Sequence, residues 1–100
     1  MPETTVQKLN GAMKLQLAGD LNSAEPIYQD ILEDEPDNAD VNHLLGLIRS
    51  EQDDSDEAVR LIQKAIGLNA NAAPFHHNIA GIYRCMGRLR ESESEFRRAI

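Results

Sequence analysis

Residues 39–72 read ADVNHLLGLIRSEQDDSDEAVRLIQKAIGLNANA, and this stretch decides the fold. Apolar residues recur here every three or four positions on both sides of an acidic turn at 53–56. That spacing predicts two amphipathic helices, over 39–51 and 56–68. Two helices joined by so short a turn run antiparallel and pack closely, and small residues at the crossing allow their backbones to approach. The stretch therefore predicts a helical hairpin.

The same pattern recurs before and after this hairpin at an offset of 34 residues. Small, large apolar, aliphatic and turn-forming residues each align in register. The aligned sets are Ala12, Gly46 and Ala80; Ala24, Ala58 and Ser92; Tyr28, Ile62 and Phe96; Leu32, Ile66 and Ile100; and Gly19, Asp53 and Gly87. We therefore predict three repeat units, at 5–38, 39–72 and 73–100, the third incomplete, after a disordered tail at 1–4.

Each outer unit also predicts two helices. In the first unit we expect them over 5–17 and 22–34, and in the third we expect the second helix to begin near Leu89. Pro26 lies inside the second helix of the first unit, where a proline costs about 3 kcal/mol. We therefore expect that helix to begin late, with Ser23 as its cap, or to bend.

Composition narrows the possible functions. The 100 residues include 10 Lys and Arg and 17 Asp and Glu, for a net charge of −7. This charge argues against nonspecific binding of nucleic acid or of an anionic membrane. Residues 1–50 carry −6 of it, and two interpretations stay open: the acids keep helix ends and turns soluble, which we favour, or the acidic end attracts partners with basic segments. The sequence shows neither a membrane-spanning run nor a signal peptide, and its single thiol suits the cytoplasm.

Few side chains offer catalytic or metal chemistry. His76 and His77 are adjacent, so on a helix they point about 100° apart. His43 holds the slot of His77 one unit earlier, at the spacing of neighbouring helices, which is too wide for direct chelation. Cys85 is expected to be a small, partly buried filler. We therefore expect no metal site, no cofactor and no catalysis.

The repeat resembles the tetratricopeptide repeat, a 34-residue helix–turn–helix unit with the pattern W-x2-L-G-x2-Y…A-x3-F…P. The resemblance covers residues 5–100. The slot of the Trp departs from the pattern, since it holds Lys8, Asn42 and His76. The matches at the other positions are Leu45-Gly46, Ile79-Ala80, Tyr83, Pro36, and the pairs Ala24 with Tyr28, Ala58 with Ile62, and Ser92 with Phe96.

The resemblance implies an all-α, right-handed solenoid whose first helices line a concave face. It also implies that a protein or peptide segment binds on that face. Together with the lack of catalytic residues and the free thiol, this predicts a non-catalytic, cytoplasmic interaction scaffold. In the family, the residues at certain positions of the first helix of each unit face the partner. The residues of this chain at those positions are Leu9, Met13, Gln16, His43, Leu47, Ser50, His77, Asn78 and Arg84, and we expect them to bind the partner. Among them we expect Leu47, His77 and Arg84 to contribute most.

Two subtypes of the family differ in the chemistry of this groove. One binds a C-terminal carboxylate with cations and amides, but this chain has Leu9 and His43 in such slots, so we do not expect that clamp. The other, in large glycosyltransferases, carries a ladder of asparagines. Asn10 and Asn78 fit two of its rungs, whereas Leu44 interrupts it.

Two other functions remain open. The third unit stops at Ile100, inside its second helix, which favours a segment of a longer protein. Such a segment would be the targeting or recruiting arm of a bacterial glycosyltransferase, sulfotransferase or oxygenase. Alternatively the uncapped end, with Phe96 and Ile100, pairs with another chain to form a homodimer or a larger assembly.

Overall fold

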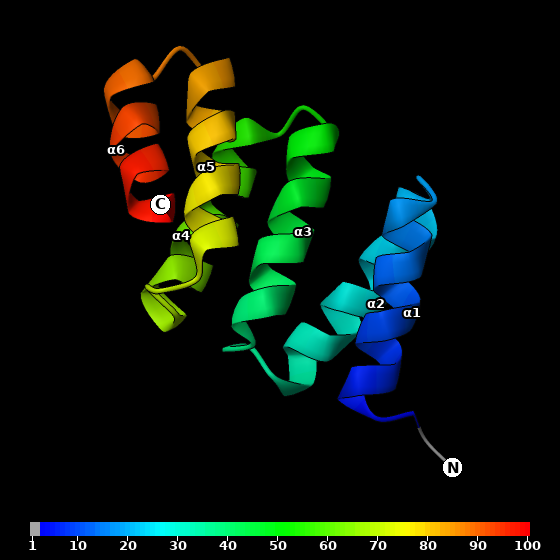
Figure 1. Ribbon diagram of the computed structural model, residues 1–100. Coiled ribbons are helices and arrows are strands. Elements are labelled where there is room, and N and C mark those ends of the chain that lie inside the picture. The colour runs from blue at the N-terminus through cyan, green and yellow to red at the C-terminus, as the bar shows by residue number, and fades with distance from the viewer. Residues whose placement is uncertain (1–2) are drawn as a thin grey trace.

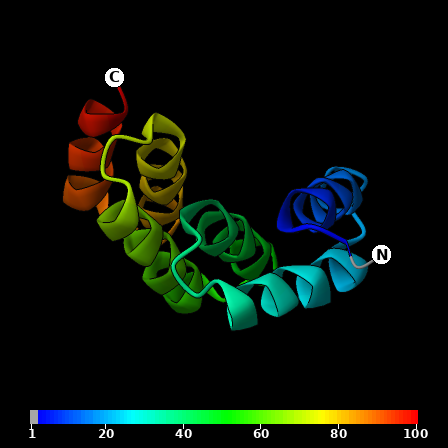
Figure 2. The ribbon, with the colours of Figure 1, turned by 90° about the horizontal axis from the view of Figure 1, so that it is seen from below.

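The computed structural model describes residues 3–100, in which every regular element is an α-helix. Consecutive helices form three antiparallel hairpins that stack side by side (Figure 1). Seen along the helices, α1, α3 and α5 lie on the inner side of a curve and α2, α4 and α6 on the outer side (Figure 2). The predicted all-α solenoid is confirmed. The helices are α1 (Thr5–Leu17), α2 (Leu21–Asp34), α3 (Ala39–Glu51), α4 (Ser55–Leu68), α5 (Ala73–Cys85) and α6 (Leu89–Ala99).

Each hairpin turn contains one residue in the left-handed backbone region. Gly19 has φ 84°, Asp53 has φ 62° and Gly87 has φ 77°. These are the three turn formers that recur at the repeat period. Glycine adopts this conformation without steric cost, and Asp is one of the few other residues that tolerate it. The periodic turn residues therefore set where each hairpin reverses.

The start of α2 differs from the prediction. The helix begins at Leu21, and the carboxylate of Asp20 accepts a hydrogen bond from the backbone N–H of Ser23 at 3.2 Å. The expectation that Ser23 caps a late start is wrong, because the Asp three residues earlier already caps the first turn. Pro26 is exposed, and the helix continues through it to Asp34.

The N-terminus of α1 is also capped. The Thr4 hydroxyl accepts a hydrogen bond from the backbone N–H of Gln7, and the Gln7 side chain accepts one from the backbone N–H of Thr4. This reciprocal pair is a capping box. The disordered tail predicted over residues 1–4 therefore does not include Thr4, and residues 1 and 2 lie outside the described residues.

The recurring small residues lie at the helix crossings. The closest approach is at Gly46, where a Cβ would stand 2.7 Å from Cγ1 of Ile62 and 3.2 Å from the carbonyl oxygen of Ala58. All six predicted crossing residues are buried, as the spacing required: Ala12, Gly46, Ala80, Ala24, Ala58 and Ser92.

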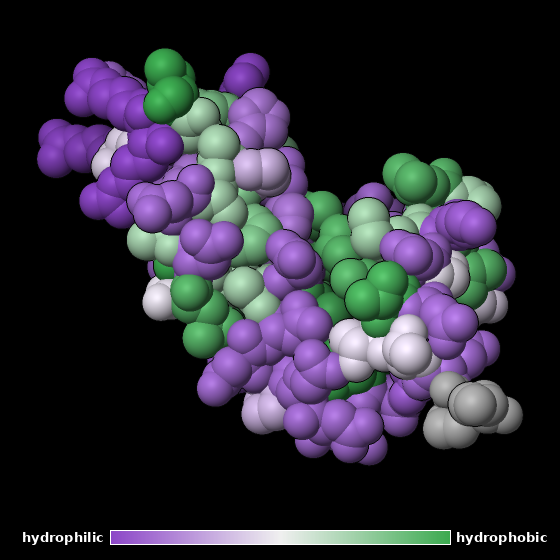
Figure 3. All heavy atoms as spheres, turned by 60° about the horizontal axis from the view of Figure 1, so that its bottom comes forward, coloured by the Kyte–Doolittle hydropathy of each residue, from purple (hydrophilic) through white to green (hydrophobic). Residues whose placement is uncertain are grey.

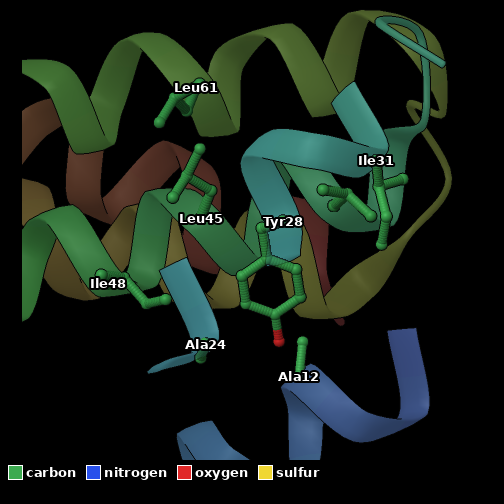
Figure 4. Close-up of a cluster of buried hydrophobic side chains, with 8 residues drawn as sticks. Ala12, Ala24, Tyr28, Ile31, Leu45, Ile48 and Leu61 are labelled. Carbon is green, nitrogen blue, oxygen red and sulfur yellow. The ribbon is translucent and has the colours of Figure 1, made fainter. Parts of the chain in front are cut away.

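Larger apolar residues fill the space beside these crossings in two clusters. The first joins the first two hairpins, and Figure 4 shows the ring of Tyr28 inside it with the hydroxyl directed toward α1. The second joins the last two hairpins around Ile62, Phe75 and Ile79. Because each cluster draws on neighbouring hairpins, no hairpin buries its apolar face alone.

The slots that hold Trp in the family pattern contain Lys8, Asn42 and His76 instead, and each forms polar contacts. The ammonium group of Lys8 lies 2.8 Å from the carboxylate of Asp30 on α2. Asn42 is 1% exposed and donates to the carbonyl oxygens of Pro36, at 3.2 Å, and Asn38, at 2.9 Å. Asn42 therefore fastens the α2–α3 loop to the start of α3.

His76, the third residue of this series, fastens the α4–α5 loop. Its buried ring lies 2.5 Å from the carboxylate of Glu95 at Nδ1 and 2.7 Å from the carbonyl of Ala70 at Nε2. Both partners are acceptors, so a ring that donates to both is an imidazolium. Burial and nearby Arg98 lower the pKa of His76, but the two hydrogen bonds and the charge of Glu95 outweigh them and raise it.

Cys85 is exposed at the C-terminal end of α5, so the expectation of a partly buried filler is wrong. The buried face of α5 runs through Ile79, Ile82 and Tyr83. Cys85 falls outside that face, because it follows the buried Ile79 by six positions, which places it about 240° around the helix from Ile79.

Candidate functional site

A cleft opens on the concave face between α1 and α3. It consists of two adjoining cavities of about 540 and 370 Å³, and Met13 of α1 and Leu44 of α3 line both. Figure 3 shows the hollow, with hydrophobic side chains on its floor. The other lining residues are Gln16, Leu17, Leu47, Ser50 and Glu51 in the larger cavity, and Leu9, Asp40, His43, Ala72, Pro74 and Phe75 in the smaller.

The cleft exists because α1 stands away from α3. α1 packs mainly against α2, and α2 in turn packs against α3, whereas α3 and α5 touch directly. Apolar side chains on the inner side of α1 are consequently left uncovered: Met13 is 39% exposed and Leu17 is 87% exposed. These exposed apolar side chains lie together rather than singly, which makes the cleft the candidate interaction surface of the chain.

Gln16 bridges the floor of the cleft. The hydroxyl of Tyr28 donates to its side-chain oxygen at 2.7 Å, and its amide nitrogen donates to the carbonyl of Leu44 at 3.4 Å. Burial raises the pKa of Tyr28 to about 12, so its phenol remains a donor at neutral pH. The bridge holds α1, α2 and α3 together beneath the cleft.

His43 contributes a neutral polar group at the other end of the floor. Its ring packs on Phe75 with centroids 4.6 Å apart, and its Nε2 lies 2.8 Å from the amide nitrogen of Asn78. The amide is a donor, so this ring nitrogen accepts and carries no proton. Burial lowers the pKa of His43, and the nearby charge of Asp40 offsets this only in part.

Two carboxylates stand at opposite ends of the cleft. Asp40 lies in the first turn of α3 and Glu51 lies in its last turn. Among the described residues that line the two cavities, none is Lys or Arg. The cleft is therefore an apolar surface with a negative charge at each end.

The structure brings most of the predicted partner-binding residues together. Asn78 lies beneath the cleft against His43, while His77 and Arg84 are exposed on α5 and line neither cavity. Six of the nine line the cleft: Leu9, Met13, Gln16, His43, Leu47 and Ser50.

Sequence reasoning did not include Leu44 among the candidate residues, although it lines both cavities. Leu44 stands out in the sequence only because it occupies a position where the other two units have asparagine, Asn10 and Asn78. The signal that points to it is the run Leu44-Leu45-Gly46-Leu47-Ile48, which holds more apolar residues than one face of a helix can bury. Leu45 and Ile48 are buried, and Leu44 and Leu47 remain partly exposed toward the cleft.

Stacked helical hairpins with a grooved inner surface define a helical-repeat protein of the interaction-scaffold class. The family model described as tetratricopeptide repeat matches residues 15–80. The chain belongs to the tetratricopeptide repeat family, whose members in general serve as protein–protein interaction domains.

Solved structures share this fold. MamA MSR-1 is 25% identical to this chain, with a TM-score of 0.81, over 96% of this chain and 55% of its own. Another MamA crystal structure is 20% identical, with a TM-score of 0.88, over 99% of this chain and 58% of its own. An O-GlcNAc transferase of Thermobaculum terrenum is 24% identical, with a TM-score of 0.88, over 99% of this chain and 20% of its own. This chain thus spans about half the length of the MamA chains.

None of the curated proteins matches this sequence. Within residues 3–100, no helix has the length and apolar character that crossing a membrane requires. In the same range, no three His, Cys, Asp or Glu side chains come together as a metal ion would need.

Proposed function

We propose that the cleft between α1 and α3 binds a segment of a partner protein. The observation that carries this proposal is the set of uncovered apolar side chains that face each other across the cleft, above all Met13 and Leu17 on α1 and Leu47 on α3. A partner that covers them removes apolar area from water, which stabilises a complex by about 25 cal/mol per Å² before the costs of association.

Met13→Glu tests the proposal against a matched control. Met13 is 39% exposed inside the cleft, and Leu68, at the end of α4, is 42% exposed outside it. A glutamate at either position adds the same charge at similar exposure, so both variants should fold, which circular dichroism checks. Immobilised wild type and Leu68→Glu should retain the same partners from a cell lysate, and Met13→Glu and Leu47→Glu should lose them.

An identical set of proteins from all four chains would refute the cleft as the binding site. The same experiment with Arg84→Glu asks whether the binding surface extends to α5, where the predicted residues His77 and Arg84 are exposed. Loss of the partners with Arg84→Glu would place α5 within the surface, whereas full retention would limit the surface to α1 and α3.

The two other functions stay proposals beside this one. The fold of a transferase segment matches this chain, which is compatible with a recruiting arm of a larger enzyme. Sequencing the transcript past the codon of Ile100 tests that function, because a recruiting arm requires the reading frame to continue into a catalytic domain. Sedimentation over a wide concentration range tests self-assembly, because a strict monomer excludes a homodimer.

A further inference from the structure

This inference rests on the proposed function and concerns the conformation of the bound segment. An extended peptide leaves its N–H and C=O groups to be paired by the surface beneath it or by water, whereas a helix pairs them internally. The floor of the cleft offers little pairing: within residues 3–100, the hydroxyl of Ser50 is the one uncharged polar side-chain group of the lining that no other residue engages. The Gln16 amide is engaged by Tyr28 and by the carbonyl of Leu44, and Nε2 of His43 is engaged by Asn78.

The charged residues that line the cleft are Asp40 and Glu51, one at each end of it. Asp40 and Glu51 are eleven residues apart on α3, which corresponds to about 16 Å, or three helical turns. Both are exposed, and neither takes part in an ion pair among residues 3–100. They are therefore free to pair with two cations of a partner.

The two cavities have a spacing that suits a helix. Along α3, the larger is lined by Leu44 to Glu51 and the smaller by Asp40 to Leu44. Their centres are thus about six residues, or about 9 Å, apart along α3. On a partner helix, apolar residues at positions i and i+4 or i+7 span about 6 to 10 Å on one face. One such stripe is long enough to reach both cavities.

We propose that the cleft binds an amphipathic helix of about three turns from a partner protein, with its apolar stripe in the two cavities and a Lys or Arg near each end, facing Asp40 and Glu51. The apolar stripe supplies most of the affinity. The exposed charge pairs set orientation and speed association, and each changes affinity only about two- to fivefold. Met13→Glu removes a central apolar contact and should weaken binding at least about thirtyfold.

A displayed library of random 16-residue peptides tests the inference even while the natural partner is unidentified. Peptides are selected on the whole chain and then sorted by their loss of binding to Met13→Glu and their retention by Leu68→Glu. The retained peptides are sequenced and synthesised, and their dissociation constants are measured by fluorescence anisotropy. Circular dichroism of each complex, minus that of the free chain, reports the conformation of the bound peptide.

Three outcomes are possible. Cleft-dependent peptides that gain helicity on binding, lose it with one central proline, and weaken about two- to fivefold with Asp40→Asn or Glu51→Gln support the inference. Cleft-dependent peptides that bind without helicity, or with unchanged affinity for both neutralised variants, overturn the inference and leave the proposed function standing. If no selected peptide depends on Met13, the cleft is not a binding site, and the proposed function fails with the inference.

Discussion

Replacement of Gly46 by alanine tests whether the α3–α4 crossing is as close as described. The added Cβ would stand 2.7 Å from Cγ1 of Ile62 and 3.2 Å from the carbonyl oxygen of Ala58. Ile62 is 0% exposed, so its side chain has no solvent to move into. The carbonyl belongs to the backbone of α4. Relief of the contact therefore requires the two helices to separate.

Two opposing effects set the size of the change. Alanine in a helix interior is favoured over glycine by about 0.5–1 kcal/mol. Forcing an extra methyl group into a packed core costs about 1–3 kcal/mol. The difference between them is about 0–2.5 kcal/mol, so we expect Gly46→Ala to lower the free energy of unfolding, by about 1 kcal/mol at the middle of that range. Gly81→Ala is the matched control, because Gly81 lies in the middle of α5 with nothing within 4 Å of an added Cβ. It should stabilise the chain by about 0.5–1 kcal/mol.

Urea denaturation followed by circular dichroism measures both variants. The wild-type midpoint should lie between them, with Gly46→Ala lower and Gly81→Ala higher. A double variant adds a check: in an Ile62→Ala background the clash atom is gone, so Gly46→Ala should cost less than in wild type. If Gly46→Ala is as stabilising as Gly81→Ala, the crossing is looser than described and the reasoning is wrong.

Other predictions concern the polar anchors. Asn42→Ala should lower the free energy of unfolding by about 1–3 kcal/mol, measured in urea, because it removes both hydrogen bonds that the buried Asn42 amide donates to the carbonyls of Pro36 and Asn38, each worth about 0.5–1.5 kcal/mol. The raised pKa of His76 means that its link to Glu95 stabilises fully below the ordinary value of 6.5 and weakens as pH rises through the raised pKa. The stability difference between wild type and His76→Gln should therefore shrink as pH rises, and a difference independent of pH would contradict a charged ring. Asp54→Ala should lower the melting temperature through loss of the α4 cap, worth about 0.5–2 kcal/mol, and an unchanged melting temperature would contradict that role.

The helix boundaries were predictable because their signals are local. Gly19, Asp53 and Gly87 recur at the repeat period, and each marks a reversal of the chain. The start of α2 was mistaken because two cap residues, Asp20 and Ser23, stand three positions apart. The proline that follows favoured the later one, although the earlier one forms the cap.

The residues on the inner face were also predictable, because a helix places every third or fourth residue on one side. The opening of the cleft was not. It depends on how far α1 stands from α3, and the spacing of the repeats in the sequence does not encode that distance. For the same reason Leu44 was overlooked: its slot in the repeat indicates which face it occupies, but not that the facing helix leaves it uncovered.

The ion pair between Lys8 and Asp30 is kept or lost in a recombined chain according to where the repeats are joined. Asp30 has its counterparts in Lys64 of the second repeat and Arg98 of the third, so only the first repeat has an acid in that slot. A crossover within a hairpin turn, joining α1 to α4 or α6, would place Lys8 opposite a cation. A crossover between hairpins keeps Lys8 with Asp30. Whole hairpins are therefore the units that duplication or deletion can move without loss of this pairing.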